Sequence, residues 1–145
     1  MLTGITHCAL TVKDMEKSKD FFCRVLGFRQ AFEINKPETG EPWIVYLHAG
    51  GGQFVELFYN GSKDTVWEPG MRGFNHICFS VEDIHRFAQH IKDQGGILDV
   101  QPKMGADHNW QCWITDPDGV RIEIMQISPE SPHARALAMY KEGAQ

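Results

Sequence analysis

The sequence predicts an α+β protein built from two tandem copies of one βαβββ unit, and three observations support this. Residues 4–14 (GITHCALTVKD) are echoed by residues 73–83 (GFNHICFSVED). Further along, each copy carries one glutamate, Glu56 or Glu123, between apolar neighbours in a strand-like run. Strand-like and helix-like periodicities also follow one another in the same order in both copies. A repeat of this length predicts two equivalent units.

The first copy opens with an alternating strand at residues 6–12, whose apolar side chains lie on one face while His7 lies on the other. Asp14 is suited to cap a following helix, which should end before Gly27. Three more strands are expected, the first of them less clear and the last two joined by a glycine turn: residues 28–34, 43–48 and 53–59.

The second copy repeats this order. An alternating strand places His76 opposite the apolar side chains, and Asp83 is expected to cap a helix that ends at the glycine pair 95–96. A less clear strand follows at residues 97–102. The last two strands, at residues 111–115 and 120–127, flank a D-P-D-G stretch that suits a type I turn.

We expect the 145 residues to form a single domain. Its parts are the units at 4–60 and 73–127, a linker at 61–72, and a tail at 129–145 with a short helix near residues 133–140.

Composition narrows the class of function. The net charge is −5 and Lys and Arg do not cluster, which argues against nucleic acid as a partner. No apolar run approaches the length of a membrane span and no leader pattern precedes the first strand, so we expect a cytoplasmic protein. The four cysteines are scattered, as expected of reduced structural thiols.

Four side chains are candidate metal ligands: His7, Glu56, His76 and Glu123. Each is expected on the strand face turned away from the helices. Equivalent positions of two units can meet near a pseudo-two-fold axis, within one chain or across a dimer. Two imidazoles and two carboxylates suit one divalent transition metal: Ni, Zn, Co, Mn or Fe. The simpler alternative is that these residues merely occupy strands, although buried glutamate is rare unless it is paired or metal-bound.

These residues resemble those of a known family. The paired βαβββ units, the D-P-D-G-x-x-I-E-I stretch at 116–124 and the His/Glu/His/Glu set are similar to the vicinal oxygen chelate superfamily, which includes glyoxalase I, or lactoylglutathione lyase. The likeness spans residues 4–127. Within that superfamily, keeping all four ligands is similar to glyoxalase I. The run from Glu56 to Asn60 also resembles its E-L-x-x-N stretch, whose asparagine contacts glutathione.

The resemblance implies that the two units form a curved sheet around a metal site, and that the protein is a metal-dependent lyase or isomerase. It would transfer a proton through a metal-bound enediolate of a small hydroxyketone or thiol adduct. Glu123 or Glu56 would carry the proton, and the resemblance favours Glu123. Thr11 stands where bacterial glyoxalase I usually has an arginine that holds a glutathione carboxylate, so we expect weak use of glutathione.

Other substrate contacts and other functions are open. Besides Thr11 and Asn60, the polar loop before the Glu123 hairpin offers His108 and Trp110. Residues 73–79 look equally like methylmalonyl-CoA epimerase, and a non-catalytic small-molecule-binding module is a third possibility. Because glyoxalase I-like relatives often share each site between chains, a homodimer is expected.

Overall fold

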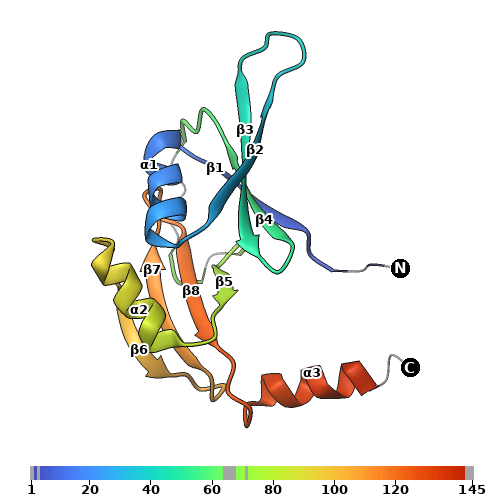
Figure 1. The fold of residues 1–145 in the computed structure, drawn as a ribbon, viewed down its shortest axis with the longest axis vertical. Helices are drawn as coiled ribbons and strands as arrows, with labels where there is room; N and C mark the ends of the chain where they lie inside the picture. The colour runs from blue at the N-terminus through green and yellow to red at the C-terminus, as the bar shows by residue number, and fades with distance from the viewer. Residues whose placement is uncertain (1, 3, 64–67, 71, 143–145) are drawn as a thin grey trace. The chain divides into compact units, whose positions relative to one another are not determined.

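The computed structural model describes residues 2, 4–63, 68–70 and 72–142. The chain divides into two compact units, the first up to residue 66 and the second from residue 67 (Figure 1). Each unit contains one four-stranded mixed sheet and a helix before its second strand, so the predicted α+β class and the two tandem units are confirmed. The predicted linker at 61–72 includes residues 64–67 and 71, which lie outside the described residues.

The first unit has the strand order β1-β4-β3-β2. Strands β1 and β4 run parallel, with His7 paired to Phe54 and Ala9 to Glu56, and the other pairs are antiparallel. The elements of this unit are β1 (His7–Thr11), α1 (Met15–Asp20), η1 (Phe21–Val25), β2 (Arg29–Asn35), β3 (Pro42–Gly50) and β4 (Gln53–Phe58).

The second unit repeats the topology, with the order β5-β8-β7-β6 and β5 parallel to β8. Its less clear strand lies slightly later than predicted. The elements are β5 (Ile77–Ser80), α2 (Ile84–Asp93), β6 (Val100–Met104), β7 (Trp110–Thr115), β8 (Arg121–Gln126) and α3 (Pro132–Glu142).

The helix caps form as predicted, but the first helix ends differently. Asp14 accepts a hydrogen bond from the Lys17 amide at 3.1 Å, and Asp83 accepts from the amides of His85 and Arg86. The last turn of the first helix is a π-helix, in which the Leu26 amide donates to the carbonyl of residue 21. This wider turn still buries its apolar side chains.

Strand alternation explains how each sheet is packed. The buried side chains of β3 and β4 alternate with Tyr46 and Glu56, and those of β7 and β8 alternate with Trp113 and Glu123. The apolar residues at the alternate strand positions lie on the opposite face of the sheet, where they pack against the helix of their own unit. The core residues are Phe22, Val45, Leu47, Val55 and Leu57 in the first unit, and Ile84, Ile91, Cys112, Ile114, Ile122 and Ile124 in the second.

We call the sheet face opposite its own helix the distal face. Directly paired residues of an antiparallel ladder lie on the same face, so the register assigns the members. The distal face of the first unit carries Tyr46, Phe54, Glu56 and Phe58. The distal face of the second unit carries Gln111, Trp113, Thr115, Arg121, Glu123 and Met125.

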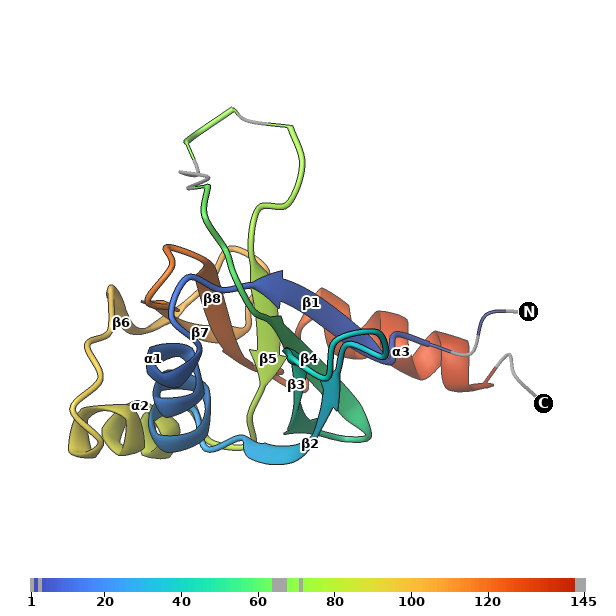
Figure 2. The same ribbon diagram turned by 90° about the horizontal axis from the view of Figure 1, so that it is seen from above.

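A buried amide fixes the end of the second sheet. The Asn109 side chain donates to Asp107 at 2.7 Å and accepts from the Ser128 amide at 2.9 Å. It thereby joins the loop before β7 to the segment after β8. The C-terminal helix α3 begins just beyond this point and extends away from the strands of its unit (Figures 1 and 2). None of the described helices has the length and apolarity required of a membrane span.

Candidate functional site

In the second unit, His76 and Glu123 form a close pair. The Nε2 atom of His76 lies 3.2 Å from a carboxylate oxygen of Glu123, a side chain buried to 6% exposure. The side-chain amide oxygen of Asn75 accepts a hydrogen bond from Nδ1 of His76 at 2.7 Å. Since Nδ1 then carries the proton of the neutral ring, the lone pair of Nε2 faces the carboxylate.

The first unit contains the equivalent pair. Nε2 of His7 lies 3.4 Å from a carboxylate oxygen of Glu56, which is 5% exposed. The Thr6 hydroxyl lies 3.3 Å from Nδ1 of His7. In both units the residue before the histidine therefore contacts its second ring nitrogen, which is the arrangement that orients metal-binding histidines.

The two pairs are chemically suited to a cation. A carboxylate oxygen accepts hydrogen bonds, and an imidazole nitrogen without a proton does the same, so a proton or a metal ion between the two makes the contact favourable. Within the described part of the chain, no group of three or more His, Cys, Asp or Glu side chains forms a complete metal site. Each unit contains one such pair of a histidine and a glutamate.

The glutamates also influence neighbouring titratable groups. Partial desolvation of the Cys78 thiol, followed by the charge of Glu123 and a hydrogen bond to it, raises the pKa of Cys78 to about 12. A hydrogen bond to Glu56 raises the pKa of Tyr46. Cys78 and Tyr46 are therefore neutral at physiological pH, and each donates a hydrogen bond to the glutamate of its own unit.

The cross-strand neighbour of each glutamate differs between the units. Tyr46 lies opposite Glu56, and Trp113 occupies the equivalent position opposite Glu123. The Trp113 indole donates to Gln111 at 2.9 Å rather than to the glutamate, and its ring lies 4.8 Å from that of His76. Sequence reasoning missed Tyr46 and Trp113, although the equivalent spacing of the two hairpins was a usable signal.

The predicted substrate contacts are scattered. Thr11 is exposed at the end of β1, and Asn60 is exposed beyond β4 with a left-handed φ of 69°. His108 is exposed in the turn before β7, with φ 62°. Trp110 packs against His85 at 5.0 Å on the helix-covered face of its sheet, away from the face that carries Glu123.

Comparisons with known proteins agree with this architecture. The family model described as the Glyoxalase/Bleomycin resistance protein/Dioxygenase superfamily matches residues 4–124. A Vibrio cholerae protein named probable lactoylglutathione lyase is 34% identical over 131 residues, which cover 84% of this chain and 89% of that protein. A Synechocystis protein of the same name is 31% identical over 128 residues, covering 86% and 95%.

Solved structures show the same fold. The crystal structure of a glyoxalase family protein from Enterococcus faecalis matches with a TM-score of 0.72 at 24% identity. The match covers 85% of this chain and 97% of the other.

Proposed function

Because the chain belongs to the Glyoxalase/Bleomycin resistance protein/Dioxygenase superfamily, we propose that it is a metal-dependent lyase or isomerase of glyoxalase I type. Its substrate would be a small hydroxyketone or thiol adduct. The observation that carries the proposal is the repeated His–Glu pair, at 3.4 Å in the first unit and 3.2 Å in the second, with each carboxylate buried. The names of the Vibrio and Synechocystis relatives favour a lyase over the methylmalonyl-CoA epimerase or a non-catalytic binding module.

The metal ligands we propose are His7, Glu56, His76 and Glu123. Their nitrogen and oxygen donors fit one divalent ion of the series Ni, Zn, Co, Mn and Fe. When bound, such an ion supplies Lewis acidity to two adjacent oxygens of a substrate. Asn75 supports the fit, because it fixes the His76 ring with Nε2 directed toward the glutamate.

We assign the proton transfer to Glu123. A base must move between a ligand position and the substrate carbon, and a hydrogen bond to its carboxylate hinders that movement. Glu56 has such a bond, from the Tyr46 hydroxyl. At the equivalent position Trp113 donates its N–H elsewhere, to Gln111, and the donor to Glu123 is the Cys78 thiol, which is a weaker hydrogen-bond donor than a phenol. This difference supports Glu56 as the fixed ligand and Glu123 as the acid–base.

The remaining parts of the proposal concern the substrate and the assembly. Thr11 has no cationic group for a glutathione carboxylate, so we propose a substrate other than the methylglyoxal–glutathione hemithioacetal. Asn60 and His108 are proposed as substrate contacts. We further propose a homodimer that acts in the cytoplasm.

Metal analysis of the purified protein tests the proposal. We expect about one divalent transition metal per four-ligand site. His76→Ala and Glu123→Ala should each lower the occupancy sharply. His133→Ala and Glu130→Ala, which change exposed residues of the same types, should leave it unchanged. Full metal retention in both ligand variants would contradict the assignment of His76 and Glu123 as metal ligands.

A further inference from the structure

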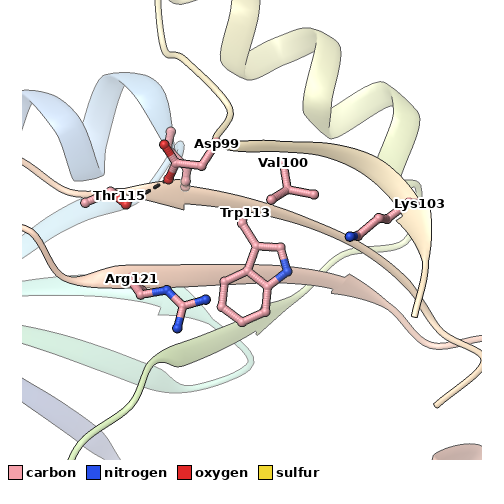
Figure 3. A pocket seen from close by; sticks show the side chains of 7 residues that line it. Asp99, Val100, Lys103, Trp113, Thr115 and Arg121 are labelled. Atoms are coloured by element: carbon pink, nitrogen blue, oxygen red, sulfur yellow. Dashed lines mark hydrogen bonds between the residues drawn. The ribbon is translucent and has the colours of Figure 1, made fainter. Parts of the chain in front are cut away.

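A pocket of about 280 Å³ lies over strands β6, β7 and β8 of the second unit (Figure 3). Its walls come mainly from the distal face of the sheet, because Trp113, Thr115 and Arg121 all have the strand parity of Glu123, whereas Ile114 has the other parity. The pocket therefore lies on the same sheet face as the His76–Glu123 pair. The side chains that line it include Asp99, Val100, Lys103, Trp113, Thr115 and Arg121.

The charges in the pocket favour an anion. Lys103 and Arg121 contribute two positive charges and Asp99 one negative charge. The Asp99 carboxylate already accepts a hydrogen bond from the Thr115 hydroxyl at 2.7 Å. Among the described residues, Lys103 makes no ion pair with any carboxylate. Counted over the lining side chains alone, two cations and one carboxylate leave one positive charge, which complements a monoanion.

Trp113 connects the pocket to the proposed reaction centre. The guanidinium carbon of Arg121 lies 4.7 Å from the centre of the indole, a cation–π distance. The indole ring also contacts His76, and its N–H is held by Gln111. One rigid aromatic side chain thus touches both the candidate metal ligand and the cation of the pocket.

The distance between Arg121 and Glu123 limits the length of a ligand that contacts both side chains. Arg121 and Glu123 are two residues apart on one face of β8, which corresponds to about 7 Å along an extended strand. A small molecule spans this distance with a chain of a few carbon atoms. A planar guanidinium with a nearby ammonium is suited to a carboxylate, which Arg can bind through two parallel hydrogen bonds.

We propose that this pocket binds a carboxylate of the substrate, so that the substrate is a short hydroxyketone acid whose oxygens face the His76–Glu123 pair. Only the identity of the reacting end rests on the proposed function. The carboxylate subsite stands on the pocket, its charge and its place beside Trp113. The two parts of the inference can therefore fail separately.

Calorimetric titration of the protein, after incubation with a divalent transition metal and measurement of its metal content, tests the subsite. The probes are 5-hydroxy-4-oxopentanoate and its uncharged methyl ester. We expect the acid to bind roughly tenfold to a hundredfold more tightly than the ester, as one charged hydrogen bond provides. Arg121→Gln and Lys103→Gln should each reduce this preference, and Arg121→Lys should retain part of it. Lys92→Gln, which changes an exposed lysine of α2, is the matched control and should leave the preference for the acid over the ester unchanged.

The outcomes separate the two proposals. Equal binding of acid and ester by the wild-type protein would overturn the carboxylate subsite, and so would an undiminished preference in the Arg121→Gln/Lys103→Gln double variant. Tighter binding of inorganic phosphate than of the acid would also overturn it, in favour of a phosphate site. The preference for the acid over the ester can depend on Arg121 and Lys103 in a protein that takes up no metal. That result would support the carboxylate subsite and contradict the glyoxalase-type function.

Discussion

The Tyr46 hydroxyl donates a hydrogen bond to the Glu56 carboxylate, across the β3–β4 ladder in which the two residues are directly paired. The Phe32 ring stacks on Tyr46 with 4.2 Å between centroids, which fixes the phenol on the distal face. A hydrogen-bonded partner of this kind orients a carboxylate before a metal binds. The second unit has no tyrosine at the equivalent position, which is occupied by Trp113.

Tyr46→Phe removes only this hydroxyl. We expect metal affinity to fall by about tenfold to a hundredfold, the usual effect of losing a group that orients a ligand. A competition titration with a chelator of known affinity measures the change. Tyr140→Phe removes a hydroxyl from an exposed residue of α3 and should have no effect. Equal metal affinity in wild type and Tyr46→Phe would show that Glu56 does not depend on Tyr46.

Replacing the two glutamates one at a time tests which is the base. Exchange of the carbon-bound protons of hydroxyacetone in D2O, followed by NMR, reports proton abstraction directly. With metal content matched, Glu123→Gln should lower the exchange rate by about 10²–10⁴-fold, as expected for loss of a general base. Glu56→Gln should lower it less. The reverse order would assign the proton transfer to Glu56.

The exposed residue Thr11 is expected to limit the use of glutathione. The wild-type protein should turn over the methylglyoxal–glutathione hemithioacetal weakly. Thr11→Arg should raise kcat/KM by roughly tenfold to a hundredfold, the effect of one charged hydrogen bond. Thr11→Gln, which adds length without charge, is the control. A wild-type kcat/KM at or above about 10⁵ M⁻¹s⁻¹ would contradict the expectation.

The proposed homodimer is tested by sedimentation. Metal-loaded protein at micromolar concentration should sediment with the mass of a dimer, the commonest symmetric homo-oligomer. Sedimentation only as a monomer, with metal still bound, would show that the four ligands meet within one chain.

The turn before β8 should make stability depend on pH through Asp116. One oxygen of this buried carboxylate accepts from the amides of Asp118 and Val120 at 2.9 and 2.7 Å. Asp116→Ala removes both bonds and should lower the free energy of unfolding by about 1–3 kcal/mol. Asp93→Ala, at the exposed end of α2, should change it by less than about 0.5 kcal/mol. Thermal or urea unfolding measures both.

The sign of the pH effect follows from the pKa. Burial raises the pKa of Asp116 above its ordinary value of 3.8. The folded state therefore takes up a proton before the unfolded state as the pH falls, and the cost of burying the charge is relieved. The stability difference between wild type and Asp116→Ala should grow as the pH falls from neutral through the folded-state pKa toward 3.8. A difference that shrinks over this range would contradict the raised pKa.

Local signals predict much of this fold. The Asp14 and Asp83 caps, the strand alternation and the D-P-D-G turn depend on residues close in sequence, and the elements form where those signals lie. The π-helical end of the first helix is not predictable in this way, because its apolar stripe also fits an α-helix. The second unit's β6 begins at Val100, later than predicted, since pairing with Trp113 rather than local pattern sets its start.

The candidate site depends more on tertiary register. The repeat predicted that His7 and Glu56 are equivalent to His76 and Glu123, and within each unit the parallel pairing of the outer strand brings its histidine to its glutamate. Trp110 shows where the sequence fails, because a one-residue difference in register decides which face of the sheet it occupies. The whole ligand set remains a prediction, since neither unit alone contains all four side chains.

The buried Asn109 has a mechanical consequence. A load applied to α3 reaches the sheet through the segment that follows β8, where the Ser128 amide is bonded to the Asn109 side chain. This bond links that segment to the loop before β7. Movement of α3, whether from an attached label or from a neighbouring molecule, is therefore resisted there before it is transmitted along β8 to Glu123.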